Sequence, residues 1–408
     1  MPLAARRRED DLSAACARLS TKPWLGAAMA RLPRLEPWIR RQHLGVARLP
    51  APTGGEGLRA EWMRTQFAAL GLETAMDAAG NVLGQMPARS ARRPWILITA
   101  HLDTAFPPGT PMEMRAEGGV WRGPGIGDNA AGLAALLALA RLLAEAKLGA
   151  EHWPFRLAAN VGEEGEGNLR GMRQLFAGAA AGEIAHTLVL DGPGLGATTQ
   201  ALGSRRFRVQ VAAPGGHSWA DAGAASAIHA LARVADRLLQ AAGNEPGVSA
   251  CNIGQISGGG AINAVAAAAS MKVDLRAADA AGLDRLTAAL QAALQAGVEE
   301  ENRHARQGAA VARLESLGER PAAALPPEAP LRAALHAVDE RLGIASADLL
   351  ASTDANVPLA LGCSAVRLGA GGRGGGAHSL EEWFDPVGRP LALRRILWLM
   401  ALLAETGI

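Results

Sequence analysis

Short apolar runs alternate with helical segments over the first 200 residues, and this alternation limits the fold more than any other feature of the sequence. Three runs, at 95–100, 155–161 and 187–190, are typical of strands buried on both faces. Between the first two, an Ala/Leu-rich helix is expected to begin at Asp128-Asn129, which suits a helix cap, and to end near Lys147. Strands that alternate with helices indicate an α/β domain with a mostly parallel sheet.

The pattern changes after residue 200, where residues 206–211 alternate polar and apolar side chains as a strand with one wet face does. A helix (225–240), two strand-like segments (248–256, 269–275), a second helix (281–298) and a last strand-like segment (309–314) follow. This β-α-β-β-α-β order is that of a ferredoxin-like (α+β) sandwich. Since 408 residues exceed the usual size of one core, we predict a catalytic domain at 1–200 and 315–408 with an inserted domain at 201–314.

Composition excludes several classes of function. The formal net charge of +2 gives no reason to expect nucleic acid or an anionic membrane as a partner. The three cysteines, Cys16, Cys251 and Cys363, are too widely spaced for a cysteine zinc site and argue against a disulfide framework. The sequence has neither an apolar run long enough to span a membrane nor a secretory signal pattern, so the cytoplasm is the predicted location.

Seven acidic or histidine residues lie near the carboxyl ends of predicted strands or at the start of the following helix: His101, Asp103, Asp128, Glu163, Glu164, Asp191 and His378. Ligands of open α/β sheets bind outside the carboxyl ends of the strands. We therefore expect these side chains to converge.

The chemistry of this set indicates a metal centre. Two imidazoles (His101, His378) and three carboxylates (Asp128, Glu164, Asp191) form a nitrogen and oxygen set that suits zinc, with cobalt or manganese as substitutes. Five ligands exceed the needs of one open tetrahedral site, but they serve two metals if one carboxylate bridges.

Two acidic residues are then left for other roles. Asp103 can accept the second imidazole N–H of His101 and fix its tautomer. Glu163 can act as general base on a water bound to the metals, because metal binding lowers the pKa of the water to about 7.

Seven short motifs occur in one order along residues 98–382: His101-Leu102-Asp103, Gly127-Asp128-Asn129, Gly162-Glu163-Glu164-Gly165, Leu190-Asp191-Gly192, Gly215-Gly216-His217-Ser218, Asp274-Leu275-Arg276 and His378. In this order they resemble the M20 family of metallopeptidases, which includes peptidase T, carboxypeptidase G and the deacylases of acetylornithine and succinyl-diaminopimelate. The resemblance implies a zinc-exopeptidase-like catalytic domain and an inserted domain that serves as lid and dimerisation module.

The resemblance also assigns roles to residues. It implies two Zn²⁺ per chain, with Asp128 bridging, His101 and Asp191 on one zinc, and Glu164 and His378 on the other. It implies Glu163 as base, Asp103 as the residue that orients His101, and a cis peptide bond at Asp128–Asn129.

In the inserted domain, the resemblance implies that His217 stabilises the oxyanion in the active site of a partner subunit, and hence a homodimer. Asn263 and Arg276 resemble groups that hold the substrate's backbone and carboxylate. The remaining histidines, His43 among them, are expected to be structural or on the surface.

The predicted function is zinc-dependent cleavage of an amide bond in short peptides by an exopeptidase of the di- or tripeptidase kind. Asp191, where the deacylase-like members tend to have glutamate, favours the peptidase T and dipeptidase branch. One alternative is an amidohydrolase for N-acyl or N-carbamoyl amino acids or another non-peptide C–N bond. A second alternative is a non-catalytic, metal-binding interaction protein.

Overall fold

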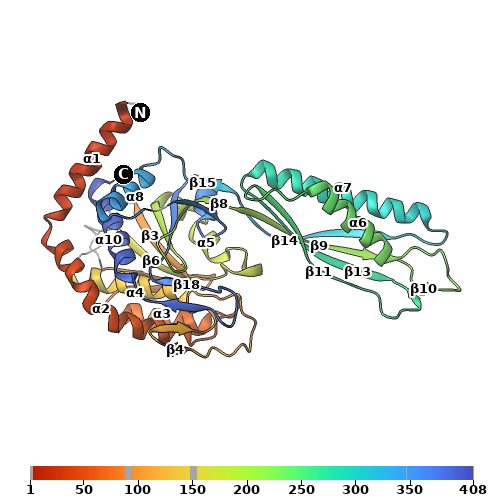
Figure 1. Ribbon diagram of the computed structural model, residues 1–408, viewed down its shortest axis with the longest axis horizontal. Helices are drawn as coiled ribbons and strands as arrows, with labels where there is room; N and C mark the ends of the chain where they lie inside the picture. The colour runs from red at the N-terminus through yellow and green to blue at the C-terminus, as the bar shows by residue number, and fades with distance from the viewer. Residues whose placement is uncertain (1–2, 88–93, 148–153, 346, 408) are drawn as a thin grey trace. The chain divides into compact units, whose positions relative to one another are not determined.

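The computed structural model describes residues 3–87, 94–147, 154–345 and 347–407. They form two compact units, Met1–Gln200 with Ala324–Ile408, and Ala201–Ala323 (Figure 1). The second unit ends later than the predicted insert because strand β14 spans Val311–Arg320, whereas the sequence pattern predicts a strand that ends at residue 314.

The first unit is built on a nine-stranded sheet in the order β1-β2-β6-β3-β7-β17-β8-β15, with β16 pairing with β8. The strands are β1 (Glu73–Met76), β2 (Val82–Gln85), β3 (Trp95–His101), β6 (Phe155–Asn160), β7 (Ile184–Leu190), β8 (Ala197–Ala201), β15 (Ala323–Ala324), β16 (Asp348–Ala351) and β17 (Ser364–Leu368). The central strands β6, β3, β7 and β17 are parallel, while β2 and β8 pair antiparallel beside them. The predicted α/β class with a mostly parallel central sheet is therefore confirmed.

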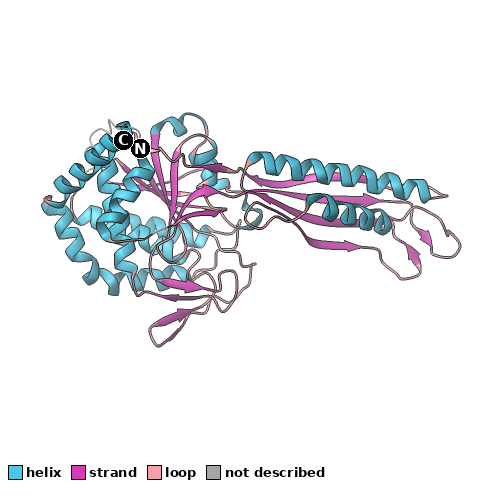
Figure 2. Cartoon of the chain, turned by 45° about the horizontal axis from the view of Figure 1, so that its top comes forward, coloured by secondary structure: helices cyan, strands magenta, loops and turns pink. Residues whose placement is uncertain are grey.

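Helices surround this sheet (Figure 2). They are α1 (Leu3–Ser20), α2 (Pro23–Ala47), α3 (Gly57–Ala69), α4 (Ala130–Glu145), α5 (Arg170–Leu175), α8 (Pro330–Leu342), α9 (Asn356–Ala360) and α10 (Arg389–Thr406), with 3-10 turns η1 (Gly165–Gly167) and η2 (Gly178–Glu183). Almost every side chain of α4 is buried, because α4 packs on β3, β6 and β7 and is itself covered by α2 and α10. The apolar Ala/Leu composition of α4 follows from this double contact.

A small antiparallel sheet in the order β18-β19-β5-β4 was not predicted from the sequence. It joins β4 (Arg115–Glu117) and β5 (Val120–Arg122) to β18 (Arg373–Gly375) and β19 (Trp383–Asp385). The loop that carries Asp128 follows β5, and His378 lies between β18 and β19. This sheet therefore connects two segments that are distant in the sequence and that each bear a predicted ligand.

The second unit is a four-stranded antiparallel sheet, β11-β13-β9-β14, with two helices packed on it (Figure 2). In chain order its elements are β9 (Gly203–Ala212), β10 (Gly216–His217), α6 (Ala227–Ala242), β11 (Ser249–Gly258), β12 (Ala264–Val265), β13 (Ala268–Ala277), α7 (Ala280–His304) and β14. Its buried core is formed by apolar residues of the strands and of the inner faces of α6 and α7. Apart from the short β10–β12 pair, the order is the predicted β-α-β-β-α-β.

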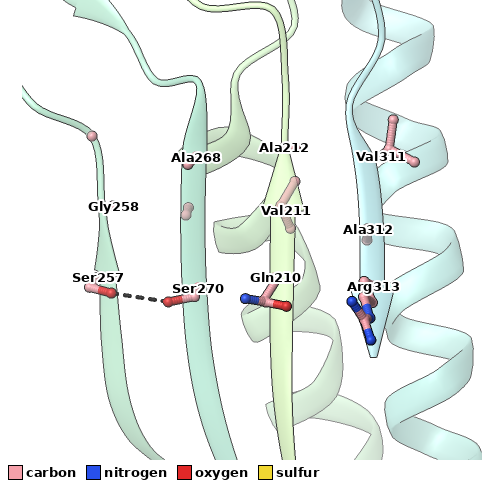
Figure 3. A pocket seen from close by; sticks show the side chains of 12 residues that line it. Gln210, Val211, Ala212, Ser257, Gly258, Ala268, Ser270, Val311, Ala312 and Arg313 are labelled. Carbon is pink, nitrogen blue, oxygen red and sulfur yellow. Dashed lines mark hydrogen bonds between the residues drawn. The ribbon is translucent and has the colours of Figure 1, made fainter. Parts of the chain in front are cut away.

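The face of this sheet opposite the helices carries a shallow hollow of about 740 Å³ (Figure 3). Polar side chains from all four strands line up across it, and the hydroxyls of Ser257 and Ser270 lie 3.1 Å apart. The lining residues include Gln210 and Arg313 but none of the predicted site residues.

Candidate metal centre

The carboxyl ends of three neighbouring strands position most of the predicted ligands. Strand β3 lies between β6 and β7, and all three run in the same direction. His101 is the last residue of β3, Glu163 and Glu164 follow β6, and Asp191 follows β7. Because parallel strands end at the same edge of a sheet, these side chains lie together, as the sequence predicts.

The first cluster consists of His101, Asp128 and Asp191, whose potential ligand atoms lie within 4.8 Å of one another. His101 Nε2 lies 3.0 Å from Asp128 Oδ1 and 3.7 Å from Asp191 Oδ1. His101 Nδ1 lies 3.1 Å from the backbone carbonyl oxygen of Asp103. Since a carbonyl only accepts, Nδ1 carries the proton and Nε2 is the atom available to a metal.

The second cluster consists of Asp128, Glu164 and His378. His378 Nε2 lies 3.4 Å from Asp128 Oδ2 and 3.2 Å from Glu164 Oε1. His378 has a φ of 64°, in the left-handed region that side-chain-bearing residues seldom adopt and that is concentrated at functional sites. Asp128 thus belongs to both clusters, one oxygen facing each imidazole.

The carboxylate oxygens in these clusters fit a metal site. Within the described part of the chain, Asp128 Oδ1 and Glu164 Oε1 are buried and lack a hydrogen bond of acceptable geometry. Burying such an oxygen without a partner is costly, and a divalent cation satisfies oxygens of this kind. The nitrogen and oxygen donors, together with these two unsatisfied oxygens, fit bound divalent metal.

Electrostatics in the cluster favour bound cations. Burial by itself would lower the pKa of His101, but the neighbouring carboxylates of Asp103, Asp128 and Asp191 raise it well above the ordinary value. The neighbouring carboxylates of Asp128 and Glu164 raise the pKa of His378 to about 10. The carboxylates therefore attract positive charge to both imidazoles, and a metal competes with protons for these positions.

Asp103 makes contacts beyond the predicted one with His101. Its carboxylate accepts the backbone N–H groups of Glu163 (3.0 Å) and Glu164 (2.8 Å) and the hydroxyl of Thr53 (2.9 Å). It lies 3.6 Å from His101 Nδ1, farther than the backbone carbonyl of the same residue. Burial would raise the pKa of Asp103, but the interaction with His101 and the backbone N–H groups of Glu164 and Glu163 lower it to about 2. The carboxylate therefore holds the Glu163-Glu164 turn, and Asp103 contacts the His101 imidazole through both its carboxylate and its carbonyl oxygen.

The peptide bond between Asp128 and Asn129 is cis, as expected. The Asn129 side chain donates to the Leu190 carbonyl (2.9 Å) and accepts from the N–H groups of Gly132 (3.0 Å) and Gly192 (3.2 Å). The Asn129 side-chain amide therefore caps α4 and links it by hydrogen bonds to the end of β7, directly before Asp191.

Sequence reasoning missed two buried carboxyl groups. Glu382 accepts three backbone N–H groups of the segment that carries Asp128, and burial raises its pKa to about 7. Asp354, after β16, accepts from the Asn160 side chain (2.6 Å) at the end of β6, and burial raises its pKa to about 7. For Glu382, the only signal in the sequence was the adjacent pair Glu381-Glu382, just after His378.

The other predicted site residues lie in the second unit. His217 is exposed in β10, and its Nδ1 accepts the backbone N–H groups of Trp219 (3.1 Å) and Ala220 (3.3 Å). The proton of the neutral ring is therefore on Nε2, free to donate. The pairing of β10 with β12 brings Asn263 beside it, with Ser218 N–H donating to the Asn263 carbonyl (3.0 Å).

Arg276 lies near the far end of β13 from this pair. Its Nε donates to Asp274 Oδ2 (2.7 Å), and its side chain is 38% exposed. The guanidinium is thus oriented by a neighbouring carboxylate and still accessible.

The sequence model of Peptidase family M20/M25/M40 matches residues 97–403. The chain therefore belongs to this family and is a hydrolase of the class that acts on C–N amide bonds. No curated protein sequence matches the chain significantly. Within the described residues, none of the helices combines the length and apolarity needed to cross a membrane.

Three solved structures illustrate the fold. Aminopeptidase PepT from Bacillus cereus is 19% identical over 91% of this chain and 98% of that chain, with a TM-score of 0.69. An amidase of the hydantoinase/carbamoylase family from Burkholderia vietnamiensis is 17% identical over 90% and 96%, with a TM-score of 0.68. The YXEP protein of Bacillus subtilis, a dinuclear metal-binding peptidase, is 14% identical over 93% and 99%, with a TM-score of 0.64. At these identities the likeness shows the shared fold.

Proposed function

We propose that this chain is a dinuclear zinc-dependent exopeptidase that cleaves an amide bond in di- or tripeptides. The observation that carries the proposal is the position of Asp128, whose two oxygens face His101 in one cluster and His378 in the other. A shared carboxylate between two imidazole-carboxylate clusters is the arrangement that a bridged metal pair requires. The similarity to a dinuclear metal-binding peptidase supports it.

In the proposed mechanism His101, Asp128 and Asp191 would hold one zinc, and Asp128, Glu164 and His378 would hold the other. When bound, the ions polarise the amide carbonyl and make the attacking water more acidic. Glu163, which is 7% exposed and held through its N–H by Asp103, takes the proton at its carboxylate and delivers it to the leaving amine.

The second unit supplies the remaining roles in this proposal. His217 donates from Nε2 to the oxyanion, in the active site of a partner subunit of a homodimer. Asn263 holds the substrate backbone and Arg276 its carboxylate. The dimer and the location in the cytoplasm remain predictions from the sequence.

The choice of a peptide substrate rests on Asp191 and on the similarity to aminopeptidase PepT. A second candidate is an amidohydrolase for N-carbamoyl or N-acyl amino acids, because the fold matches the amidase of the hydantoinase/carbamoylase family almost equally well. The family assignment argues against the alternative of a non-catalytic interaction protein.

Metal content and substrate hydrolysis test the proposal together. Metals are counted by mass spectrometry on the purified chain, and a panel of di- and tripeptides, N-acyl and N-carbamoyl amino acids is assayed before and after chelation. Two metals per chain with chelator-sensitive peptide cleavage support the peptidase. Two metals with cleavage of the acylated compounds alone support the amidohydrolase. No metal after reconstitution with zinc, cobalt and manganese excludes the dinuclear centre.

A further inference from the structure

The segment 125–128, which carries the shared carboxylate of Asp128, has little rigidity of its own. Two of its four residues are glycines, and Gly125 has a φ of 71°. Glycine loses more conformational freedom on folding than any other residue, so a precise position requires contacts from outside the segment. We infer that His43 and Glu382 are positioning residues for Asp128, an inference that rests on the proposed metal centre.

Glu382 binds the N–H groups of the segment. Its Oε1 accepts from Gly127 N (2.7 Å) and Asp128 N (2.7 Å), and its Oε2 accepts from Gly125 N (2.8 Å). The residue is 2% exposed. A Cβ at Gly127 would lie 2.9 Å from Glu382 Oε1, so a side chain at this position would displace the carboxylate from its N–H donors. Three bonds from one buried carboxylate fix the backbone on both sides of Ile126.

His43 binds the carbonyl of the same segment. It lies in α2, is fully buried, and its Nε2 is 2.6 Å from the Ile126 carbonyl oxygen. Its Nδ1 is 2.9 Å from Arg389 Nη2. Because a guanidinium only donates, Nδ1 is the acceptor, and the neutral ring carries its proton on Nε2 and donates it to Ile126. Burial, together with the charge of Arg389, lowers the pKa of His43 well below its ordinary value and keeps it neutral.

The His43 ring is fixed on its other sides. Its edges contact Trp121 and Phe384, with ring centroids 5.1 Å and 4.7 Å away. Arg389, at the start of α10, lies over the same two rings, and its Nη1 is 3.2 Å from Glu36 Oε1 in α2. Two contacts to α2 therefore hold Arg389, which in turn orients His43.

These contacts connect α2, which precedes the residues matched by the family model, to the backbone of a candidate metal ligand. Asp128 serves both clusters, so a shift of its backbone weakens both sites together. Loss of a residue that orients a ligand typically costs 10–100-fold in metal affinity or activity.

Zinc affinity of the chelated and reconstituted full chain tests the inference, by competition with a chromogenic chelator. The test variants are Glu382→Gln, which places an amide NH₂ against a backbone N–H, and His43→Phe, which fills the space without either hydrogen bond. Matched controls are Glu381→Gln, whose side chain is 70% exposed and pairs with Arg115, and His336→Phe on the surface of α8. His43→Gln serves as the conservative variant, because its amide can donate to Ile126 and accept from Arg389.

We expect zinc affinity to fall about 10- to 100-fold in both test variants, with kcat falling and KM little changed. The controls and His43→Gln should keep wild-type affinity. Should His43→Phe not fold, His43→Asn, which adds no bulk and is too short for both partners, takes its place. Wild-type affinity in folded test variants that have only a lower melting temperature would show a purely structural role and overturn the inference while the proposed function stands. A wild-type chain that binds no zinc overturns both.

Discussion

At the scale of single residues, Glu163 is the group on which the proposed chemistry depends. Its Glu163→Gln variant keeps the size and the backbone hydrogen bond to Asp103 but removes the base. We expect kcat to fall roughly 10²–10⁴-fold, the usual contribution of a general base, with KM and metal content unchanged. The exposed neighbour Glu166 provides the control substitution, Glu166→Gln. Activity within tenfold of wild type in Glu163→Gln would assign the base to another residue.

The buried carboxyl of Asp354 predicts a pH dependence of stability in the metal-free protein. Burial raises its pKa to about 7, above the value of about 3.9 expected in the unfolded chain. The folded state therefore holds the proton more tightly than the unfolded chain. The stability that the Asp354 carboxyl contributes is fully present below pH 4 and is lost as the pH rises to about 7. Asp354→Asn lacks this titration.

Urea unfolding in the presence of chelator measures this difference. Relative to wild type, Asp354→Asn should gain stability between pH 4 and pH 7.5, by up to about 4 kcal/mol for a shift of about three pK units. Asn160 still has an oxygen to which it can donate in the variant. A difference between the two proteins that stays constant with pH would mean that Asp354 is ionised throughout.

At the scale of elements, two helical glycines predict opposite effects of the same substitution. A Cβ at Gly132, in the first turn of α4, would lie 2.4 Å from the Leu190 carbonyl oxygen at the end of β7. At the exposed Gly26 of α2, a Cβ meets no described atom within 4 Å. Gly26→Ala should stabilise the chain by about 0.5–1 kcal/mol, and Gly132→Ala should destabilise it by about 1–3 kcal/mol through the forced shift of α4. Thermal and urea unfolding of both variants test this prediction. Equal changes in stability in Gly26→Ala and Gly132→Ala would contradict it.

The elements also show how far sequence reasoning extends. The positions of the candidate ligands at the ends of β3, β6 and β7 were predictable because each directly follows a continuous apolar run, and strand direction then brings them together. The β18-β19-β5-β4 sheet was not predictable, since strands of three residues carry no periodic signal. The role of Glu382 was hidden for a related reason: its partners Gly125 and Asp128 are joined to it only by the tertiary fold.

At the scale of the whole molecule, the proposed dimer makes two demands on one chain: its first unit must carry Glu163, and its second unit must present His217 to a partner. Glu163→Gln and His217→Ala should therefore each be nearly inactive as pure proteins. The two substitutions lie in different units. In a mixture of the two variants, an active site therefore has both groups only if it takes Glu163 from one chain and His217 from the other.

Mixing the two variants decides whether His217 acts in a partner's active site. In a mixed dimer, one site then combines an intact Glu163 with an intact His217 from the other chain, and the second site lacks both. Random exchange at equal concentrations makes half of the dimers mixed, so about a quarter of wild-type activity should return. Mixing Glu163→Gln with Glu166→Gln, and measuring the mass of the assembly by light scattering, controls for dilution and for exchange. If subunits exchange and no activity returns, His217 acts within its own chain, and the dimer is then not required for the chemistry, because each chain carries every group that the proposed reaction uses.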